Sequence, residues 1–518
     1  ADGGATWGLV LPVGFRVWSL QKSSTGWLAA LAQGNGHQAP LLARSIDLGL
    51  SWSVVATASN VYTGAGRITL AVGNPGDSVV YAFAATTNSA RQKDLYKSID
   101  GGTTFAPIGL GQYVTSGTPP VTVWVGKFPV NPNEDQPNMD IMLGQAFYNH
   151  MVLVDPADAS RNTVYIGGQL SSAKSTDGGA TWRIMSNWLA QFGLPYVHAD
   201  FHAAAIATIK GAPIVLFGGD GGLFTSDDGA RTFSSQKNDG MSSYLIYALT
   251  GNPKHADDVL IGLQDNGTRW RVGPTGTYNQ VFGGDGFGVA WSQADDLVSL
   301  ASVYYSFIIR NRRNPPNTQN KWEVGWTGIP EMNNTQLSYF RTALATPSAS
   351  ADPAGLTFFH RTVFKLYRTT NGAASWQKVF ETFNPNPPPP APQTPGRVLL
   401  RAGMQPIGIS PDNINHFGVL ANGGHAFFTA DGGATWLKKI IAAPPFVPPV
   451  PAEPGATPAL VPRWPGFNAT LAYASNNTMY IGNEAPVGQT TPSNPPQRVI
   501  KSTDGGNSWA AASRALPH

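Results

Sequence analysis

One octapeptide recurs along this chain of 518 residues, and its recurrence constrains the fold more than any other feature. The pattern is Ser/Thr-x-Asp-x-Gly-x-Ser/Thr followed by Trp or Phe. Two looser copies carry Ala in place of the Gly, and one of these also carries Asn in place of the Asp. The seven copies span residues 45–52, 98–105, 175–182, 226–233, 369–376, 429–436 and 502–509. A short motif that returns in this way is the signature of a repeat architecture.

The chemistry of the octapeptide predicts a tight turn between two strands. An Asp side chain can accept hydrogen bonds from nearby backbone N–H groups, and Gly permits a positive φ. The closing aromatic residue begins the next strand and is expected to pack between neighbouring sheets. We therefore expect each copy to be a structural turn, and we exclude its Asp from the candidate catalytic residues.

Composition agrees with an all-β chain rich in turns. The chain has 58 Gly and 42 Pro, and only 13% of its residues are charged. Short β-branched or aromatic runs bounded by turn residues recur between the octapeptides, for example at 17–20, 163–167, 213–217 and 478–482. No long segment shows a helical period, and no apolar run is long enough for a transmembrane helix.

Charge and cysteine content exclude several function classes. The net charge of +3 is small for this length, so nothing predicts a nucleic-acid partner. The chain has no Cys, which rules out both a disulfide framework and a Cys-based metal site.

The spacing of the octapeptides predicts a β-propeller with four-stranded blades. Ser45 and Ser98 are 53 residues apart, and Ser175 and Ser226 are 51 apart, which fits one blade per octapeptide. The interval from Ser226 to Thr369 is longer, and we expect two degenerate copies in it, at 265–270 and at 312–322. The prediction is a single propeller over residues 1–518 with nine or ten blades, or else seven or eight blades with long insertions.

Three further segments complete this domain prediction. The fragment at 2–7 repeats part of the octapeptide and can supply an outer strand that closes the ring. Residues 384–395 and 444–465 are rich in Pro and are expected to be extended excursions from the propeller.

The octapeptide resembles the Asp-box (BNR-type repeat) of sialidase-like and sortilin-like β-propellers. Longer strings resemble a group of bacterial propellers described as glycosyl-hydrolase-like or sortilin-like; these strings lie at 197–203, 217–223, 262–267 and 283–286. The resemblance implies a secreted or periplasmic protein. Gly66-Arg67-Ile68-Thr69 lacks the Arg-Ile-Pro signature of sialidases, and the chain is too short for the two rings of xyloglucan-type endoglucanases.

Polar residues depart from the scaffold pattern in the middle third of the chain. Loops at the ends of the inner strands form the usual site of a propeller. Several acidic, His and amide residues lie next to apolar runs that can be such strands. The candidate catalytic carboxylates are Asp200, Asp220, Asp265 and Asp285, and the candidate substrate contacts are Tyr148, His150, His202, Gln264 and Asn266.

His150, His202 and Asp285 each precede an apolar run, so we expect them around one channel mouth. Asp220 and Asp265 are expected nearer to turns of outer strands. The alternation of His198, Asp200 and His202 places the three on one face of an extended strand, where imidazole and carboxylate can bind a divalent metal ion. One ion can reach all three only if the strand bends.

Three functions remain open from the sequence. The first is a glycoside hydrolase in which two Asp carboxylates act on a polysaccharide or oligosaccharide. The second is a non-catalytic propeller that binds or assembles with a peptide, glycan or protein partner. The third is a metal-dependent enzyme that uses His198, Asp200 and His202.

Overall fold

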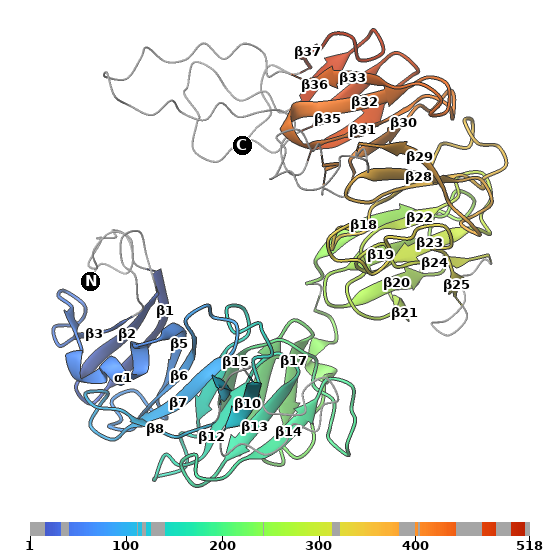
Figure 1. The fold of residues 1–518 in the computed structure, drawn as a ribbon. Coiled ribbons are helices and arrows are strands. Elements are labelled where there is room, and N and C mark those ends of the chain that lie inside the picture. Colours follow the sequence, from blue (N-terminus) through green and yellow to red (C-terminus); the bar gives the residue numbers. More distant parts are fainter. Residues whose placement is uncertain are drawn as a thin grey trace, which may run out of the picture. The chain divides into compact units, whose positions relative to one another are not determined.

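The computed structural model describes residues 16–32, 41–110, 112–116, 121–125, 140–241, 243–312, 322–382, 399–401, 405–441, 469–482 and 499–512. Nearly all of the regular structure is antiparallel β-strand (Figure 1). The chain divides into two compact units, residues 1–242 and 243–518, and each is described by itself. The expectations for residues 2–7, 384–395 and 444–465 fall outside the described residues.

The described residues of the first unit form four β-meanders, in which strands pair with their chain neighbours. Three have four strands, and the last has three strands extended by a bridge between Thr225 and Ser234. They are β1 (Arg16–Ser23), β2 (Gly26–Ala32), β3 (Leu41–Ser45) and β4 (Ser53–Val54); β5 (Ala65–Ala71), β6 (Val80–Thr86), β7 (Gln92–Ser98) and β8 (Ala106–Pro107); β11 (Met151–Val154), β12 (Val164–Gly167), β13 (Ser171–Ser175) and β14 (Arg183–Asn187); and β15 (Phe201–Ile209), β16 (Ala212–Gly219) and β17 (Gly222–Ser226). A separate hairpin consists of β9 (Gln112–Ser116) and β10 (Val121–Val125), and the short helices are η1 (Ala56–Ala58), α1 (Ser59–Tyr62) and η2 (Gln236–Asn238).

In the second unit, the residues that the structure describes form five four-stranded meanders of the same order. They are β18 (Ile246–Gly251), β19 (Val259–Leu263), β20 (Gly267–Arg271) and β21 (Asn279–Phe282); β22 (Val289–Trp291), β23 (Ser299–Ser302), β24 (Ile308–Asn311) and β25 (Glu323–Val324); β26 (Leu344–Ala345), β27 (Phe358–Arg361), β28 (Lys365–Thr369) and β29 (Gln377–Glu381); β30 (Ile407–Ile409), β31 (Phe417–Leu420), β32 (His425–Thr429) and β33 (Leu437–Ile440); and β34 (Thr470–Tyr473), β35 (Met479–Gly482), β36 (Val499–Ser502) and β37 (Ala510–Ala511). The 3-10 turn η4 (Asn422–Gly424) precedes β32.

The first strands of successive meanders lie side by side within each unit. In the first unit β1 contacts β5, β5 contacts β11, and β11 contacts β15; in the second unit the series is β18, β22, β26, β30 and β34. This is how propeller blades are arranged around an axis. The all-β prediction and the four-stranded repeat are confirmed. A single ring with nine or ten blades spans both units and stays a prediction.

Apolar side chains fill the space between neighbouring meanders. Phe83 of β6 and Ile166 of β12 belong to one such cluster, and both side chains are fully buried. Phe359 of β27 and Val419 of β31 belong to an equivalent cluster in the second unit. Because each meander buries one face against the next, the apolar face of a single meander is covered only when its neighbour is present.

Each of the seven octapeptides, called boxes from here on, follows the third strand of its meander, as the turn chemistry predicts. Six of them lead into a fourth strand, and the one at 226–233 leads to the bridge at Ser234. In the box at 175–182, the Ser175 hydroxyl donates to Asp177 at 2.8 Å and accepts from the Gly179 N–H, also at 2.8 Å. The Asp177 carboxylate also accepts from the Thr181 N–H and hydroxyl. The Thr181 hydroxyl, followed by the Thr181 N–H and Ser175, lowers the pKa of Asp177 to about 2.

The last residue but one of the third strand is basic in several meanders and reaches the next meander. Arg44 lies 3.5 Å from the Gly102 carbonyl oxygen, Lys174 lies 3.3 Å from that of Gly229, and Arg310 lies 3.5 Å from that of Gly372. In each case the acceptor belongs to the box of the following meander. We call these three contacts the inter-box links, and each joins consecutive repeats by a charge-assisted hydrogen bond.

The structure agrees with one of the two predicted degenerate boxes in its position between strands and contradicts the other. Residues 312–322 do connect the third strand, β24, to the fourth, β25, although 313–321 lie outside the described residues. The expectation of a box at 265–270 is wrong, because Asp265 lies in the turn from the second strand to the third and residues 267–271 form β20. The turn after β20 is held by another carboxylate: Asp258 accepts from the Gly273 N–H at 2.8 Å.

Candidate active site

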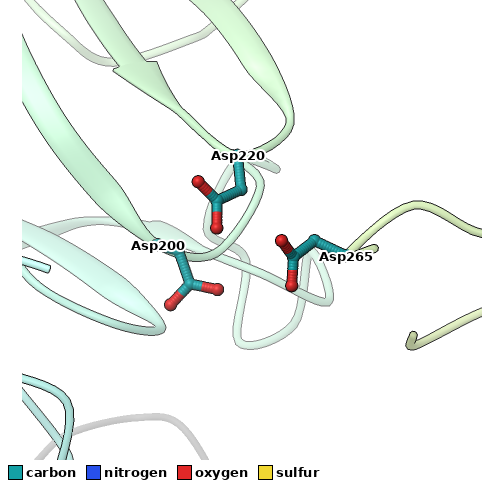
Figure 2. Close-up of side chains that lie close together, drawn as sticks. All are labelled: Asp200, Asp220 and Asp265. Atoms are coloured by element: carbon teal, nitrogen blue, oxygen red, sulfur yellow. The ribbon is translucent and has the colours of Figure 1, made fainter. Parts of the chain in front are cut away.

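The carboxylates of Asp200 and Asp220 lie together at one edge of the last meander of the first unit. Asp200 directly precedes β15, and Asp220 lies in the turn between β16 and β17 (Figure 2). In a meander, the start of the first strand and the turn from the second strand to the third lie at the same edge. One oxygen of each carboxylate lies within 4.8 Å of the other. Asp265, also drawn in Figure 2, belongs to the second unit.

Glycines allow the β16–β17 turn to approach Asp200 closely. A Cβ atom on Gly219 would lie 2.5 Å from the Asp200 carbonyl oxygen, and one on Gly221 would lie 2.2 Å from the His198 Cβ atom. The Asp220 N–H donates to the same Asp200 carbonyl at 3.3 Å. The Gly-Gly-Asp-Gly-Gly string at 218–222 therefore fits a close backbone approach that no side chain permits.

Asp220 is held by two side chains at this edge. The Tyr148 hydroxyl lies 3.2 and 3.0 Å from its two oxygens, and Nε2 of His202 lies 2.7 Å from Oδ1. The rings of Tyr148 and His202 meet edge to face with centroids 4.6 Å apart. The His202 side chain keeps 32% of its surface exposed, so solvent reaches this edge.

Asp200 is in a different environment from Asp220. Only 9% of its surface is exposed, and the fully buried Asn149 amide donates to its Oδ1 at 2.5 Å. Burial raises the pKa of Asp200 to about 6, and the neighbouring Asp220 charge adds to the shift. The hydrogen bond from Asn149 and the charges of two histidines act in the opposite direction but do not cancel it.

The loop that carries Tyr148 is fixed by an arginine of β5. The guanidinium of Arg67 donates to the carbonyl oxygens of Phe147 and Tyr148 at 3.1 and 2.8 Å and lies over the ring of Trp18. Sequence reasoning missed both Arg67 and Asn149 as members of the site. The position of Asn149 between two candidate residues was the signal for it, whereas only the fold brings Arg67 to this loop.

Two other predicted residues of the first unit, His150 and His198, form contacts away from the pair of carboxylates. His150 is 1% exposed, its Nδ1 lies 2.7 Å from the Thr69 hydroxyl, and its ring packs on Phe83. Burial holds the pKa of His150 well below its usual range. His198 directs Nδ1 to the Ala199 carbonyl oxygen at 2.9 Å. Substrate contact by His150 and metal binding by His198 stay predictions.

The expected positions along the strands are largely as predicted. His150 precedes β11, His202 lies near the start of β15, and Asp285 precedes β22, and all three strands are the first of their meanders. Asp220 and Asp265 lie in turns between second and third strands instead of outer turns. For Asp220 this difference matters, because it brings the carboxylate beside Asp200 and His202.

The second unit gathers its own group of predicted residues. The Asp265 N–H donates to Oδ1 of Asp285 at 2.8 Å, and the Tyr247 hydroxyl lies 2.9 Å from Oε1 of Gln264. The Asn266 side chain donates to the Gln264 carbonyl oxygen at 3.2 Å. Burial raises the pKa of Tyr247, and the charge of Asp285 adds to this shift. These contacts brace the β19–β20 turn within its own unit.

This chain is similar to solved structures of other proteins, but no similarity is found at the level of sequence families or curated proteins. Similar structures include the GH74 xyloglucanase from Xanthomonas campestris (15% identity over 94% of this chain and 76% of that chain, TM-score 0.39) and the GH74 enzyme of Niastella koreensis (17% over 97% and 73%, TM-score 0.29). YCF48 from Cyanidioschyzon merolae is 12% identical over 70% of this chain and 97% of that chain, with a TM-score of 0.26. At these values the likeness carries no argument about activity. Among the described residues, no helix has the length and apolar character needed to cross a bilayer.

Proposed function

We propose that the first unit is a carbohydrate-directed enzyme that cleaves glycosidic bonds outside the cytoplasm, with Asp200 and Asp220 as its two carboxyl groups. The observation that carries this proposal is the contrast between two adjacent carboxyls. Asp200 is buried with its pKa raised to about 6, while Asp220 accepts hydrogen bonds at a solvent-exposed edge. Pairs of carboxyls with divergent environments are the usual basis for separate acid and nucleophile roles.

The environments assign the roles. Asp200 keeps its proton in mildly acidic solution, so it can protonate the leaving-group oxygen. Asp220 receives donors from Tyr148 and His202, which stabilise an ionised carboxylate and fix its orientation. The carboxylate of Asp220 is therefore the nucleophile in this proposal.

The short spacing favours a double-displacement reaction. Inverting glycosidases separate their carboxyls by roughly 6.5–9.5 Å to admit a water, and retaining enzymes by roughly 5–5.5 Å. Here one oxygen pair is within 4.8 Å, which supports the retaining arrangement. An Asp220 oxygen attacks the anomeric carbon as Asp200 protonates the departing oxygen, and the ionised Asp200 then deprotonates the water that releases the sugar and regenerates Asp220.

The test is a screen of polysaccharides and aryl glycosides with the full chain and its Asp200→Ala and Asp220→Asn variants. We expect turnover in the wild type and none in Asp220→Asn. Asp200→Ala should retain turnover only for substrates whose leaving group needs no protonation, and added azide should accelerate it by attacking the glycosyl-enzyme. Equal activity of all three proteins on an unactivated substrate would contradict the proposal.

A non-catalytic binding propeller is the second candidate, and exposed aromatic side chains favour it. Phe147 is 58% exposed and Tyr148 38% exposed beside the carboxyl pair, and in the second unit Tyr304 and Phe340 stack with ring centroids 5.5 Å apart. Such surfaces suit glycan or peptide contacts without chemistry. Binding that survives in Asp220→Asn, with no turnover by the wild type on any substrate, would support this candidate.

The metal-dependent enzyme is the third candidate. His198, Asp200 and His202 supply imidazole and carboxylate donors suited to Zn²⁺ or Mn²⁺, and the positive φ of 68° at Asp200 bends the chain between the two histidines. Metal analysis of the purified protein, repeated on a His198→Ala variant, tests it. A stoichiometric ion that is lost in this variant would favour metal chemistry over the glycosidase proposal.

A further inference from the structure

We propose that the first unit has a second ligand site, a cationic pocket that binds an oxyanion such as the sulfate or carboxylate group of an acidic saccharide. The pocket is a cavity of about 370 Å³ between the box at 175–182 and the box at 226–233. It lies at the box edge of these meanders, opposite the edge that carries Asp200 and Asp220. The proposal that this pocket binds an oxyanion is independent of the proposed hydrolysis. The further proposal that a saccharide carries the oxyanion rests on the proposed hydrolysis.

Three cations line this pocket, and in the described part of the chain none of them forms a salt bridge. Lys174, Arg183 and Arg231 all contribute to the wall. Among the residues that the structure describes, none of the three has a carboxylate oxygen within 4 Å of its charged nitrogens. Lys174 donates to the Gly229 carbonyl and lies over the ring of Tyr165, and Arg183 contacts the sulfur of Met185.

The lining keeps a positive balance, with three cations against one carboxylate. Asp228 also lines the pocket, but its oxygens already accept from the hydroxyls of Ser226 and Thr232 and from two backbone N–H groups of the box. Burial lowers the pKa of Lys174; the charges of Arg183 and Arg231 lower it further, and Asp155 opposes them. Three cations share one cavity with a single carboxylate, so a bound anion would reduce their mutual repulsion.

The two arginines are specific to this pair of repeats. The residue after the closing aromatic is Arg183 in the box at 175–182, and Ser, Ala, Gln or Leu in the other six. The sixth box position is Arg231 in the box at 226–233, and Leu, Thr, Ala or Asn elsewhere. Both exceptions face one cavity, whereas Lys174 makes the inter-box link seen in other repeats. The architecture of the repeat therefore explains Lys174 but not the two arginines.

The size and lining of the pocket indicate more than a bare inorganic ion. Small-molecule sites span roughly 300–1,000 Å³, and this cavity falls at the lower end of that range. Guanidinium groups bind planar or tetrahedral oxyanions with two parallel hydrogen bonds, which fits Arg183 and Arg231. Thr176, Thr181 and the Trp182 ring complete the wall with hydroxyls and an apolar surface suited to a sugar ring.

The experiment measures binding to the full chain by calorimetry, with three probes: a sulfated glucan oligosaccharide, the same oligosaccharide without sulfate, and sodium sulfate. The test protein is the double variant Arg183→Gln/Arg231→Gln, which leaves the Lys174 link intact. The matched control is Lys210→Gln, which removes an exposed charge from the turn between β15 and β16. Thermal unfolding of each variant checks that it folds.

We expect the sulfated oligosaccharide to bind the wild type and to bind the double variant about tenfold or more weakly, with Lys210→Gln unchanged and with affinity falling as salt rises. Tighter binding of the sulfated oligosaccharide than of sodium sulfate supports a saccharide ligand, and equal binding supports a free oxyanion. No binding by the wild type, or equal weakening in Lys210→Gln, would overturn the proposal. Hydrolysis is assayed separately in the wild type and the double variant. Loss of oxyanion binding with hydrolysis retained, or the reverse, separates the failure of this proposal from the failure of the Asp200 and Asp220 proposal.

Discussion

The Tyr148 hydroxyl lies 3.2 and 3.0 Å from the two carboxylate oxygens of Asp220, although 71 residues separate the two along the chain. The contact joins the loop before β11 to the β16–β17 turn, and so it links two neighbouring meanders at the proposed site. It predicts that Tyr148→Phe leaves the fold intact and damages the nucleophile. A hydrogen bond to a charged group is worth about 1.5–3 kcal/mol, so we expect kcat/KM to fall about 10- to 100-fold.

The control for this variant is Tyr196→Phe, the same change at a 45% exposed tyrosine in the connection between β14 and β15. Its kcat/KM on the same substrate should stay within about twofold of the wild type. An equal loss in both variants would show that the effect is general to the unit and would remove Tyr148 from the site.

The pKa of Asp200 predicts the pH dependence of turnover. A general acid must carry its proton, and burial raises the pKa of Asp200 to about 6. The rate should therefore be retained below that pH and fall as the pH rises through it. A kcat/KM profile measured from acidic to alkaline pH checks this, and a rate that rises through neutral pH would contradict the acid role.

The same shift predicts that Asp200 destabilises the fold at neutral pH. In the unfolded chain this carboxyl titrates near the ordinary value of 3.8, and in the folded chain near 6, so the free energy of unfolding falls as the pH rises between these values. Asp200→Asn keeps an acceptor for the Asn149 amide and removes the buried charge. We expect it to raise the free energy of unfolding at pH 7 by up to about 3 kcal/mol, and to have little effect at pH 3.

Denaturant titrations of the wild type and Asp200→Asn at both pH values provide the measurement. Stabilisation of equal size at pH 3 and pH 7 would assign the effect to packing and not to charge. The variant should at the same time lose activity, because Asp200, whose buried charge destabilises the fold, is also the proposed general acid.

The hydrogen bonds within each box predict a graded loss of stability. Ser175 is 1% exposed, and Ser175→Ala leaves the buried Gly179 N–H without its acceptor. We expect this change to cost about 1–3 kcal/mol of unfolding free energy. Thr181→Val removes an exposed hydroxyl from the same box and should cost less. Chemical denaturation compares the two, and an equal effect would contradict the assignment of Ser175 as the buried anchor of the turn.

Local chemistry made the scaffold predictable from sequence. The Ser175–Asp177–Gly179 contacts form within one octapeptide, so the residues that make them can be recognised without a fold. The segment at 265–270 was misread because its letters imitate a box. The box hydroxyl that accepts from the backbone is missing two residues before Asp265, where Leu263 ends β19.

The site was only partly predictable because its contacts are non-local. Asp200, Asp220 and His202 were all candidates, but their pairing depends on which sheet edge each turn occupies. The expected alternation of His198, Asp200 and His202 assumed a continuous strand, whereas φ is 68° at Asp200 and β15 begins one residue later. The contact of Arg67 with the carbonyl of Tyr148 spans 81 positions, and no local pattern predicts it.

The inter-box links bear on how such a chain can grow or shrink during evolution. Each link takes its basic side chain from one meander and its glycine carbonyl from the next. Duplication or removal of such a linked pair as a whole keeps both partners, whereas a break between the two meanders leaves a cation and an acceptor without each other. Viable lengths should therefore change in steps that keep each linked pair together.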